Sequence, residues 1–266
     1  MIDLYNRQIS YLRISVTDRC NLRCRYCMPE EGMRMLQHND ILSFEEIVEV
    51  VRVAVNLGVN KIRLTGGEPL VRKGIVDLVS LIAELKGVID LAMTTNGLLL
   101  KELAGALRLA GLMRVNVSLD TIDPDKFNRL TRGGNIRDVL EGIRAAQSAG
   151  LNPVKINCVV FKSSDEEDAR QVKEFAVKEG LEVRFIRQMD LGKGEFGIVE
   201  GGEGGNCSIC NRLRLTANGM VKPCLFSEQE FSVRQLGSQA ALMQALKSKP
   251  QQGCFNRTGS FYNIGG

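Results

Sequence analysis

The chain has 266 residues, which predicts one large domain or two small ones at roughly 150 residues each. Its 35 Lys and Arg against 31 Asp and Glu give a net charge of +4, too mild for a protein that wraps nucleic acid. A hydrophobic content of 44% with 25% charged residues excludes a disordered chain. Charges interrupt every apolar run, and no signal peptide opens the chain, so we expect a soluble cytoplasmic protein.

Up to about residue 190, short β-branched runs alternate with helical patterns. The helix predicted over residues 43–57 begins with a capping box, Ser43 with Glu46, and ends at Gly58. The six predicted strands cover residues 12–16, 61–65, 90–95, 114–119, 154–160 and 182–186. Such alternation predicts an α/β fold of parallel βα units, which fits either an incomplete six-unit barrel or a doubly wound sheet.

The strand–helix alternation stops near residue 190. Seven glycines within residues 192–205 indicate a flexible connection, and residues 207–226 are typical of a metal-bound hairpin that turns at Asn218-Gly219. We therefore predict two domains, over residues 1–190 and 191–266.

Eight cysteines are many for a protein expected inside the cell, where clustered cysteines indicate metal binding or catalysis. Six of them form two groups of three: Cys20, Cys24 and Cys27, and Cys207, Cys210 and Cys224. We call these the first trio and the second trio. Cys158 is interpreted as a buried small hydrophobe.

The first trio directly follows the first predicted strand, where βα folds place their active sites. Three thiolates on one loop can hold three irons of a cubane cluster and leave the fourth iron open, whereas an electron-transfer cluster takes four cysteines. The alternative is a zinc site that lacks a ligand, but the single histidine, His38, supplies no second ligand pair.

The Cys-x3-Cys-x2-Cys spacing with Tyr26 before the last cysteine resembles the signature of radical S-adenosylmethionine (SAM) enzymes. Gly66-Gly67-Glu68-Pro69 resembles the motif that takes the SAM amino group, and further matches end the third and fourth strands. The resemblance implies a partial (β/α)6 parallel barrel with a small C-terminal iron–sulfur domain, and a cluster that cleaves SAM to a 5′-deoxyadenosyl radical. The implied SAM-binding residues are Tyr26, Gly66, Gly67, Glu68, Ser118, Arg184 and Met189.

The second trio and the residues after it resemble one branch, the GTP 3′,8-cyclase family of molybdenum cofactor biosynthesis. That resemblance implies a lyase with a second [4Fe–4S] cluster on this trio, whose open iron holds the base of GTP. The implied substrate-binding residues are Arg13, Arg63, Thr94, Lys155, Arg212 and Arg214. Arg13 and the terminal Gly265 and Gly266 match the catalytic set.

Arg13 and Arg63 are also unusual because each places a cation beside apolar residues within a predicted strand. Arg13 lies in a predicted strand next to Ile14, and Arg63 lies between Ile62 and Leu64. A cation among buried residues is costly unless an anion meets it, although a surface or salt-bridged cation is the alternative at each single position. Arginine suits a phosphate because its fork binds two oxygens at once.

Two departures from the cyclase pattern keep a second hypothesis open. The connection between residues 190 and 207 is much shorter than in that family. Cys254 is interpreted either as a fourth ligand of the second cluster or as a buried small hydrophobe. The short connection and a fourth cysteine ligand both favour a radical SAM maturase that acts on a peptide or another small molecule. Either enzyme requires an electron donor such as flavodoxin or ferredoxin; a homodimer is a further expectation.

Overall fold

The computed structural model describes residues 1–189 and 196–253. Strands and helices alternate as far as β6, apart from the consecutive helices α4 and α5. The elements follow in the order β1 Tyr11–Ser15, α1 Phe44–Asn56, β2 Lys61–Thr65, α2 Ile75–Ala83, β3 Asp90–Thr95, α3 Leu100–Leu109, β4 Arg114–Ser118, α4 Pro124–Thr131, α5 Ile136–Ser148, β5 Lys155–Val160, α6 Glu167–Lys178, β6 Glu182–Arg187, β7 Arg212–Leu215, β8 Met220–Lys222, β9 Phe231–Ser232, α7 Val233–Leu236 and α8 Ser238–Lys247. Single 3-10 turns lie at His38–Asp40, Pro69–Val71 and Cys207–Ile209. All six predicted strands are confirmed, as is the capping box of Ser43 and Glu46 before α1.

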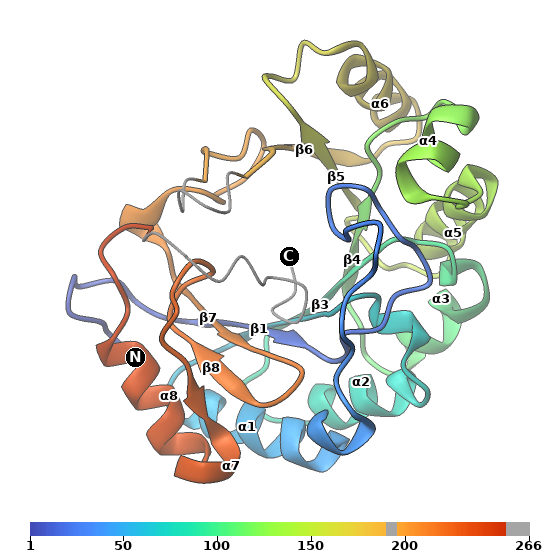
Figure 1. The fold of residues 1–266 in the computed structure, drawn as a ribbon. Helices are drawn as coiled ribbons and strands as arrows, with labels where there is room; N and C mark the ends of the chain where they lie inside the picture. The colour runs from blue at the N-terminus through green and yellow to red at the C-terminus, as the bar shows by residue number, and fades with distance from the viewer. Residues whose placement is uncertain (190–195, 254–266) are drawn as a thin grey trace.

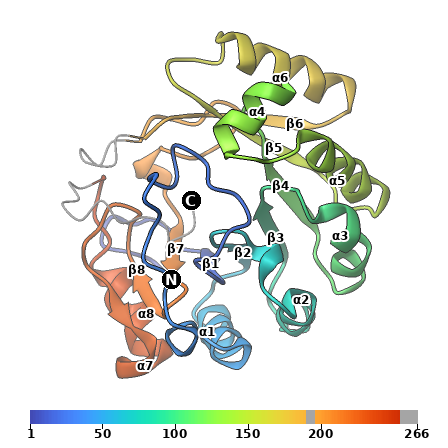
Figure 2. The ribbon, with the colours of Figure 1, turned by 45° about the vertical axis from the view of Figure 1, so that its right-hand side comes forward.

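One curved sheet carries the described strands in the order β6-β5-β4-β3-β2-β1-β7-β8-β9. Strands β1 to β6 are parallel and follow one another in sequence order. Crossovers of one hand then place every connecting helix on the same side, and Figures 1 and 2 show α1, α2, α3, α5 and α6 around the outer face. This arrangement confirms the partial barrel and excludes the doubly wound sheet.

The two faces of the sheet differ in polarity because side chains alternate along each strand. Leu12 and Ile14 of β1 are fully buried in the hydrophobic core, as are Ile47 and Val51 on the inward side of α1. The intervening Arg13 therefore faces the inside of the barrel. The outer face supplies the core, and the inner face is left for polar side chains.

The C-terminal strands continue the same sheet. β7 pairs in parallel with β1, and β8 and β9 add antiparallel strands beyond it. The predicted turn at Asn218-Gly219 is confirmed, with Gly219 at φ +83° between β7 and β8. Helix α8 packs against α1, so these elements share contacts with the barrel. The division into domains at residue 190 stays a prediction.

The described part of the glycine-rich connection, residues 196–205, packs on the last barrel strand. Phe185 and Glu200 exchange two backbone hydrogen bonds of 3.0 and 3.1 Å, and the Val199 amide donates to the Gly204 carbonyl at 2.8 Å. A Cβ atom on Gly201, at φ +77°, would lie 2.6 Å from the Val183 carbonyl oxygen. These contacts hold residues 196–205 to β6. The prediction of a flexible connection did not anticipate this packing.

Two glycines within helices are expected to respond oppositely to substitution by alanine. A Cβ on Gly142 in α5 would lie 2.4 Å from the Gly97 carbonyl oxygen, whereas a Cβ on Gly105 in α3 meets nothing within 4 Å. Gly142→Ala should lower the free energy of unfolding by about 1–3 kcal/mol because it pushes α5 off the loop after β3. Gly105→Ala should raise it by about 0.5–1 kcal/mol through helix propensity. Urea unfolding of both variants measures this, and equal effects would contradict the close packing at Gly142.

Candidate active site

The first trio lies on the loop that leaves the carboxyl end of β1. The Cys24 carbonyl accepts from the amides of Cys27 at 3.0 Å and Met28 at 2.9 Å, so the loop turns back on itself. The Leu22 amide donates to Cys20 Sγ at 3.4 Å. Burial, with the neighbouring thiols, raises the pKa of Cys24 to about 12. A raised pKa favours the neutral thiol, so metal binding at Cys24 releases a proton.

The Gly66-Gly67-Glu68-Pro69 turn packs directly against this cysteine loop. A Cβ on Gly67 would lie 2.4 Å from the Arg19 carbonyl oxygen, and one on Gly66 would lie 2.6 Å from that of Thr17. The Gly67 and Glu68 amides donate to the Thr17 and Arg19 carbonyls at 2.7 and 2.8 Å. The close backbone approach that the glycines permit is thus an approach to the loop of the first trio.

Glu68 links this turn to the end of β3. Its carboxylate accepts from the Leu70 amide at 3.0 Å, the Thr95 hydroxyl at 2.7 Å and the Asn96 amide at 2.6 Å. Asn96 in turn donates to Cys20 Sγ at 3.8 Å and to Asn21 Oδ1 at 2.7 Å. Burial raises the pKa of Glu68 to about 7, although these three donors oppose the shift. Glu68 therefore positions the first trio through Asn96.

Tyr26, the residue before the last cysteine of the first trio, contacts the loop at the end of β4. The Tyr26 hydroxyl is hydrogen-bonded to Asp120, and the Asp120 carboxylate accepts from the Val159 amide at 2.8 Å. Burial raises the pKa of Asp120 above its ordinary value. Ser118 ends β4 beside Asn157 of β5. Tyr26 and Ser118 thus lie at the same end of the barrel as Glu68, as the SAM-site prediction requires.

Three arginines lie side by side across the inner face. Arg13 of β1 is in register with Arg63 of β2 and with Arg214 of β7. Arg63 and Arg214 are 6% and 8% exposed. Burial and the charges of Arg214 and Arg63 lower the pKa of Arg13 to about 9. We call these residues the arginine row; adjacent like charges out of water require an anion nearby.

Tyr11 lies on β1 two residues before Arg13, next to the arginine row on the inner face. The guanidinium carbon of Arg63 is 5.8 Å from the centre of its ring, and Arg212 is in register with it on β7. Burial opposes ionisation of the phenol, but Arg63, Arg13, Arg212 and Arg214 outweigh it and lower the Tyr11 pKa. Sequence reasoning passed over Tyr11; its place two residues before Arg13 on one strand was the available signal.

The remaining predicted residues lie apart from one another on the barrel wall. The hydroxyl of Thr94 and the amide oxygen of its neighbour Asn116 are buried without a hydrogen-bond partner among the described residues. Lys155 forms an ion pair with Glu182. Burial and the charges of Arg63 and Arg114 lower the pKa of Arg184, which places this residue in the field of the arginine row. Met189 packs with Leu225 and Phe226, beside the second trio.

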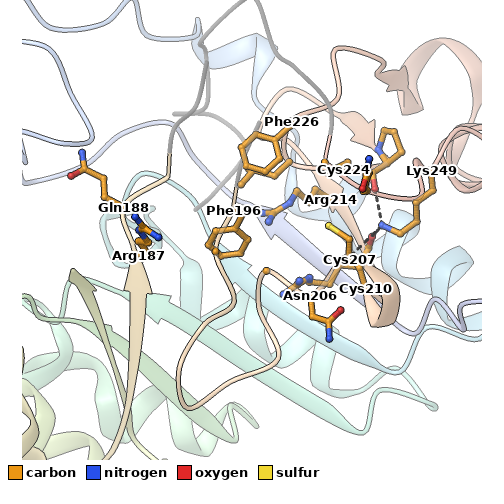
Figure 3. Close-up of a pocket in the computed structure, with 17 residues that line it drawn as sticks. Arg187, Gln188, Phe196, Asn206, Cys207, Cys210, Arg214, Cys224, Phe226 and Lys249 are labelled. Atoms are coloured by element: carbon orange, nitrogen blue, oxygen red, sulfur yellow. Dashed lines mark hydrogen bonds between the residues drawn. The ribbon is translucent and has the colours of Figure 1, made fainter. Parts of the chain in front are cut away.

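The second trio opens onto a cavity of about 830 Å³. Arg212, Arg214, Phe196, Phe226 and Lys249 are among the residues that line it with the three cysteines. Figure 3 shows the cysteines, Arg214 and Lys249 on one side, with Arg187 and Gln188 from the end of β6 across from them. The cavity thus joins the second trio to the arginine row.

The pairing of β7 with β1 fixes where the two trios lie. Cys210 comes two residues before β7, and Cys20 comes five residues after the end of β1. Because β1 and β7 run parallel in register, the trios lie at opposite ends of the strands. The arginine row lies between those ends, at Arg13 and Arg214.

Two buried cations bind the segments around the second trio. Lys249 donates to Cys210 Sγ at 3.4 Å and to the carbonyls of Arg212 and Pro223 at 2.7 and 2.9 Å. Arg7, paired with Asp3 at 2.7 Å, donates to the Cys207 carbonyl at 2.8 Å. Burial opposes ionisation of Cys210, but the charges of Lys249 and Arg212 outweigh it and lower its pKa to about 7. Sequence reasoning missed both cations, since neither belongs to a motif.

The donor sets fit an iron–sulfur cluster better than a single ion. Within the described residues, no three His, Cys, Asp or Glu side chains converge closely enough to hold one metal ion. A cubane takes its thiolates at separate corners, and hydrogen bonds to those sulfurs stabilise it. Such donors are present at Cys20 and at Cys210. Cys254, Gly265 and Gly266 lie outside the described residues.

Substitution of Glu68 by glutamine should remove a pH-dependent cost of burial. The pKa of Glu68 is raised in the folded protein, so its contribution to stability is present below about pH 4.5 and is lost as pH rises through about 7. Over that range the apo protein should lose about 3 kcal/mol relative to Glu68→Gln. Denaturant unfolding of both apo proteins across pH 4.5–7.5 measures the difference. A difference that is constant with pH would contradict the buried, high-pKa carboxyl.

Comparison with known families agrees with this geometry. Residues 14–176 match the model of the Radical SAM superfamily, and residues 163–261 match the model named Molybdenum Cofactor Synthesis C. The GTP 3′,8-cyclase of Thermodesulfovibrio yellowstonii is 43% identical over 282 residues, which cover 89% of this chain and 88% of that protein. That of Pelotomaculum thermopropionicum is 41% identical over 307 residues, covering 95% and 94%. The latter alignment is longer than the 266 residues of this chain, so this chain is the shorter of the two.

Solved structures resemble the chain in fold. Native anSMEcpe with bound AdoMet has a TM-score of 0.65 at 16% identity, over 91% of this chain and 81% of that one. Streptococcus suis SuiB bound to its precursor peptide SuiA has a TM-score of 0.57 at 21% identity, over 70% and 40%. Identities this low support the barrel alone. Membership of the superfamily implies an iron–sulfur cluster and SAM. With its two family matches and its close relatives, the chain belongs to the radical SAM enzymes, in the family of the GTP 3′,8-cyclases.

Proposed function

We propose that this chain holds two [4Fe–4S] clusters, one on each trio, and catalyses the 3′,8-cyclisation of GTP for synthesis of the molybdopterin precursor. The observation that carries the proposal is the arginine row, which lies between the ends of the barrel where the two trios are found. This order along the barrel suits a substrate that must reach both trios at once.

The inner face has the charge that a triphosphate requires. Arg63 is buried, and its Nε has no hydrogen-bond partner in the described residues. Arg13 lies in the same register, between Arg63 on β2 and Arg214 on β7. Guanidinium groups bind phosphate oxygens in pairs, and a polyphosphate offsets their mutual repulsion. Lys155 is the weaker candidate because Glu182 already pairs with it.

At the other end of the barrel, the chain's residues hold and orient SAM. Glu68 fixes the loop of Asn96, Tyr26 is held by Asp120, and Ser118 ends the adjacent strand. A carboxylate with a raised pKa becomes the ionised partner when an ammonium group approaches it. When bound, the first cluster and SAM would supply a 5′-deoxyadenosyl radical able to take hydrogen from the 3′ carbon of ribose, the carbon that is to bond to C8 of guanine.

The polar wall orients the ribose and base for that bond. Thr94 and Asn116, with buried oxygens that have no partner in the described part of the chain, can accept or donate hydrogen bonds at the middle of the barrel. The cavity at the second trio, lined by Arg212 and Phe226, gives room for the base. Alignment of the reacting carbons is the main contribution that such a wall makes to the rate.

Other expectations from the sequence stay predictions. They include catalytic roles for Gly265 and Gly266, an electron donor such as flavodoxin or ferredoxin, a homodimer, and a place in the cytoplasm. Over residues 1–189 and 196–253, none of the helices has both the length and the apolar character needed to cross a membrane.

Product analysis tests the proposed reaction. Anaerobic reconstitution should give about eight irons per chain, and the reduced protein with SAM should convert GTP to the 3′,8-cyclised product. Replacement of Cys20, Cys24 and Cys27 by alanine should remove half the iron and all SAM cleavage. Iron content and chromatography with mass spectrometry measure both. SAM cleavage in the triple variant, or GTP left unchanged by the native protein, would contradict the proposal.

The arginine row is expected to bind GTP without contributing to SAM cleavage. Arg63→Ala should weaken GTP binding by about 10- to 100-fold, because one charge-assisted contact contributes about 1.5–3 kcal/mol. SAM cleavage in the absence of GTP should stay near the native rate. Arg52, an exposed arginine on α1 paired with Glu49, gives the matched control Arg52→Ala. Calorimetric titration measures affinity, and equal affinities in the two variants would remove the arginine row from the substrate site.

A further inference from the structure

We propose that Lys249 is a positioning and charge-balancing residue of the second trio, whose ammonium donates to the Cys210 sulfur and raises the reduction potential of the cluster there. This inference rests on the proposed second cluster. It adds a residue that the motifs leave out, because Lys249 lies two residues after the end of α8 and 25 residues after Cys224, the last cysteine of the second trio.

The contacts of Lys249 are specific. Its side chain is deeply buried, with 3% of the residue exposed. The three hydrogens of the ammonium match three acceptors, which are Cys210 Sγ and the carbonyls of Arg212 and Pro223. Arg212 follows Cys210 by two residues, and Pro223 precedes Cys224. One cation therefore joins the segments next to the second and third cysteines of the trio.

The chain that follows Lys249 is held by Arg7. The Arg7 guanidinium donates to the carbonyls of Pro250 at 2.7 Å, Gln251 at 3.1 Å and Cys207 at 2.8 Å. Its Nε is held by Asp3 at 2.7 Å. These bonds join the segment after Lys249 to the first cysteine of the trio, so the ammonium has little freedom to move away from Cys210.

A buried ammonium needs negative charge close by. The hydrogen-bond partners of Lys249 within the described residues are one sulfur and two neutral carbonyl oxygens. Thiolates that carry a cluster supply the missing charge. Reduction of a cluster adds a further negative charge, so a fixed cation and an N–H···S hydrogen bond favour the reduced state and raise the potential.

The experiment isolates the second cluster in the full chain, with Cys20, Cys24 and Cys27 replaced by alanine. In this parent we compare Lys249→Gln, which keeps an amide donor but removes the charge, with Lys249→Arg, which keeps the charge. Lys247→Gln, at an exposed lysine at the end of α8, is the matched control. Iron per chain, thermal unfolding, and redox titration followed by electron paramagnetic resonance are measured on each.

Lys249→Gln should shift the midpoint potential to a lower value, while Lys249→Arg and Lys247→Gln stay close to the parent. Loss of iron from a folded Lys249→Gln, with iron retained in Lys249→Arg, also supports charge balance. An unchanged potential in Lys249→Gln, or equal loss of iron from both Lys249 variants, would overturn the inference. A parent that binds no iron would instead contradict the proposed second cluster, so the two failures are distinguishable.

Discussion

Parallel pairing of β7 with β1 is the constraint on which the arrangement of this protein depends. The pair joins Leu12 to Leu213 and Ile14 to Leu215, residues that are all fully buried on the outer face of the sheet. Closing a loop of about two hundred residues costs entropy that grows only slowly with length, and burial of these four side chains offsets it. The same register that buries them places Arg13 beside Arg214 on the inner face.

On the inner face, unlike the outer face, buried cations lie close together, which costs electrostatic free energy. Arg13 and Arg214 have pKa values lowered to about 9 and 10, since burial and other cations oppose their charge. Nothing in the packing of the core requires cations at these positions. Sites that keep such a cost are typically sites of function, where a ligand of opposite charge restores the balance. In the function proposed above, the phosphates of the substrate would offset this cost.

The loops at the carboxyl ends of β1, β2 and β3, around the first trio, are joined by hydrogen bonds. Glu68 joins three loops, because its own turn packs on the cysteine loop and its carboxylate holds Thr95 and Asn96. Asn96 completes the link by donating to Cys20. A buried carboxylate with several donors is rigid only while each donor is present. Hydrogen bonds within the protein therefore tie the loop of the first trio to Glu68 through Asn96.

The sequence by itself determined the six parallel strands, the hairpin turn at Asn218-Gly219 and both cysteine trios, because periodicity, turn chemistry and ligand spacing are local. It did not determine that the trios lie at opposite ends of the strands, or that Lys249 and Arg7 contact the second trio. Nor did spacing reveal that Glu68 acts through Asn96, or that Tyr11 lies under the arginine row. Those relations join residues far apart in the chain, and only the register of β1 with β7 and the packing of loops at the strand ends decide them.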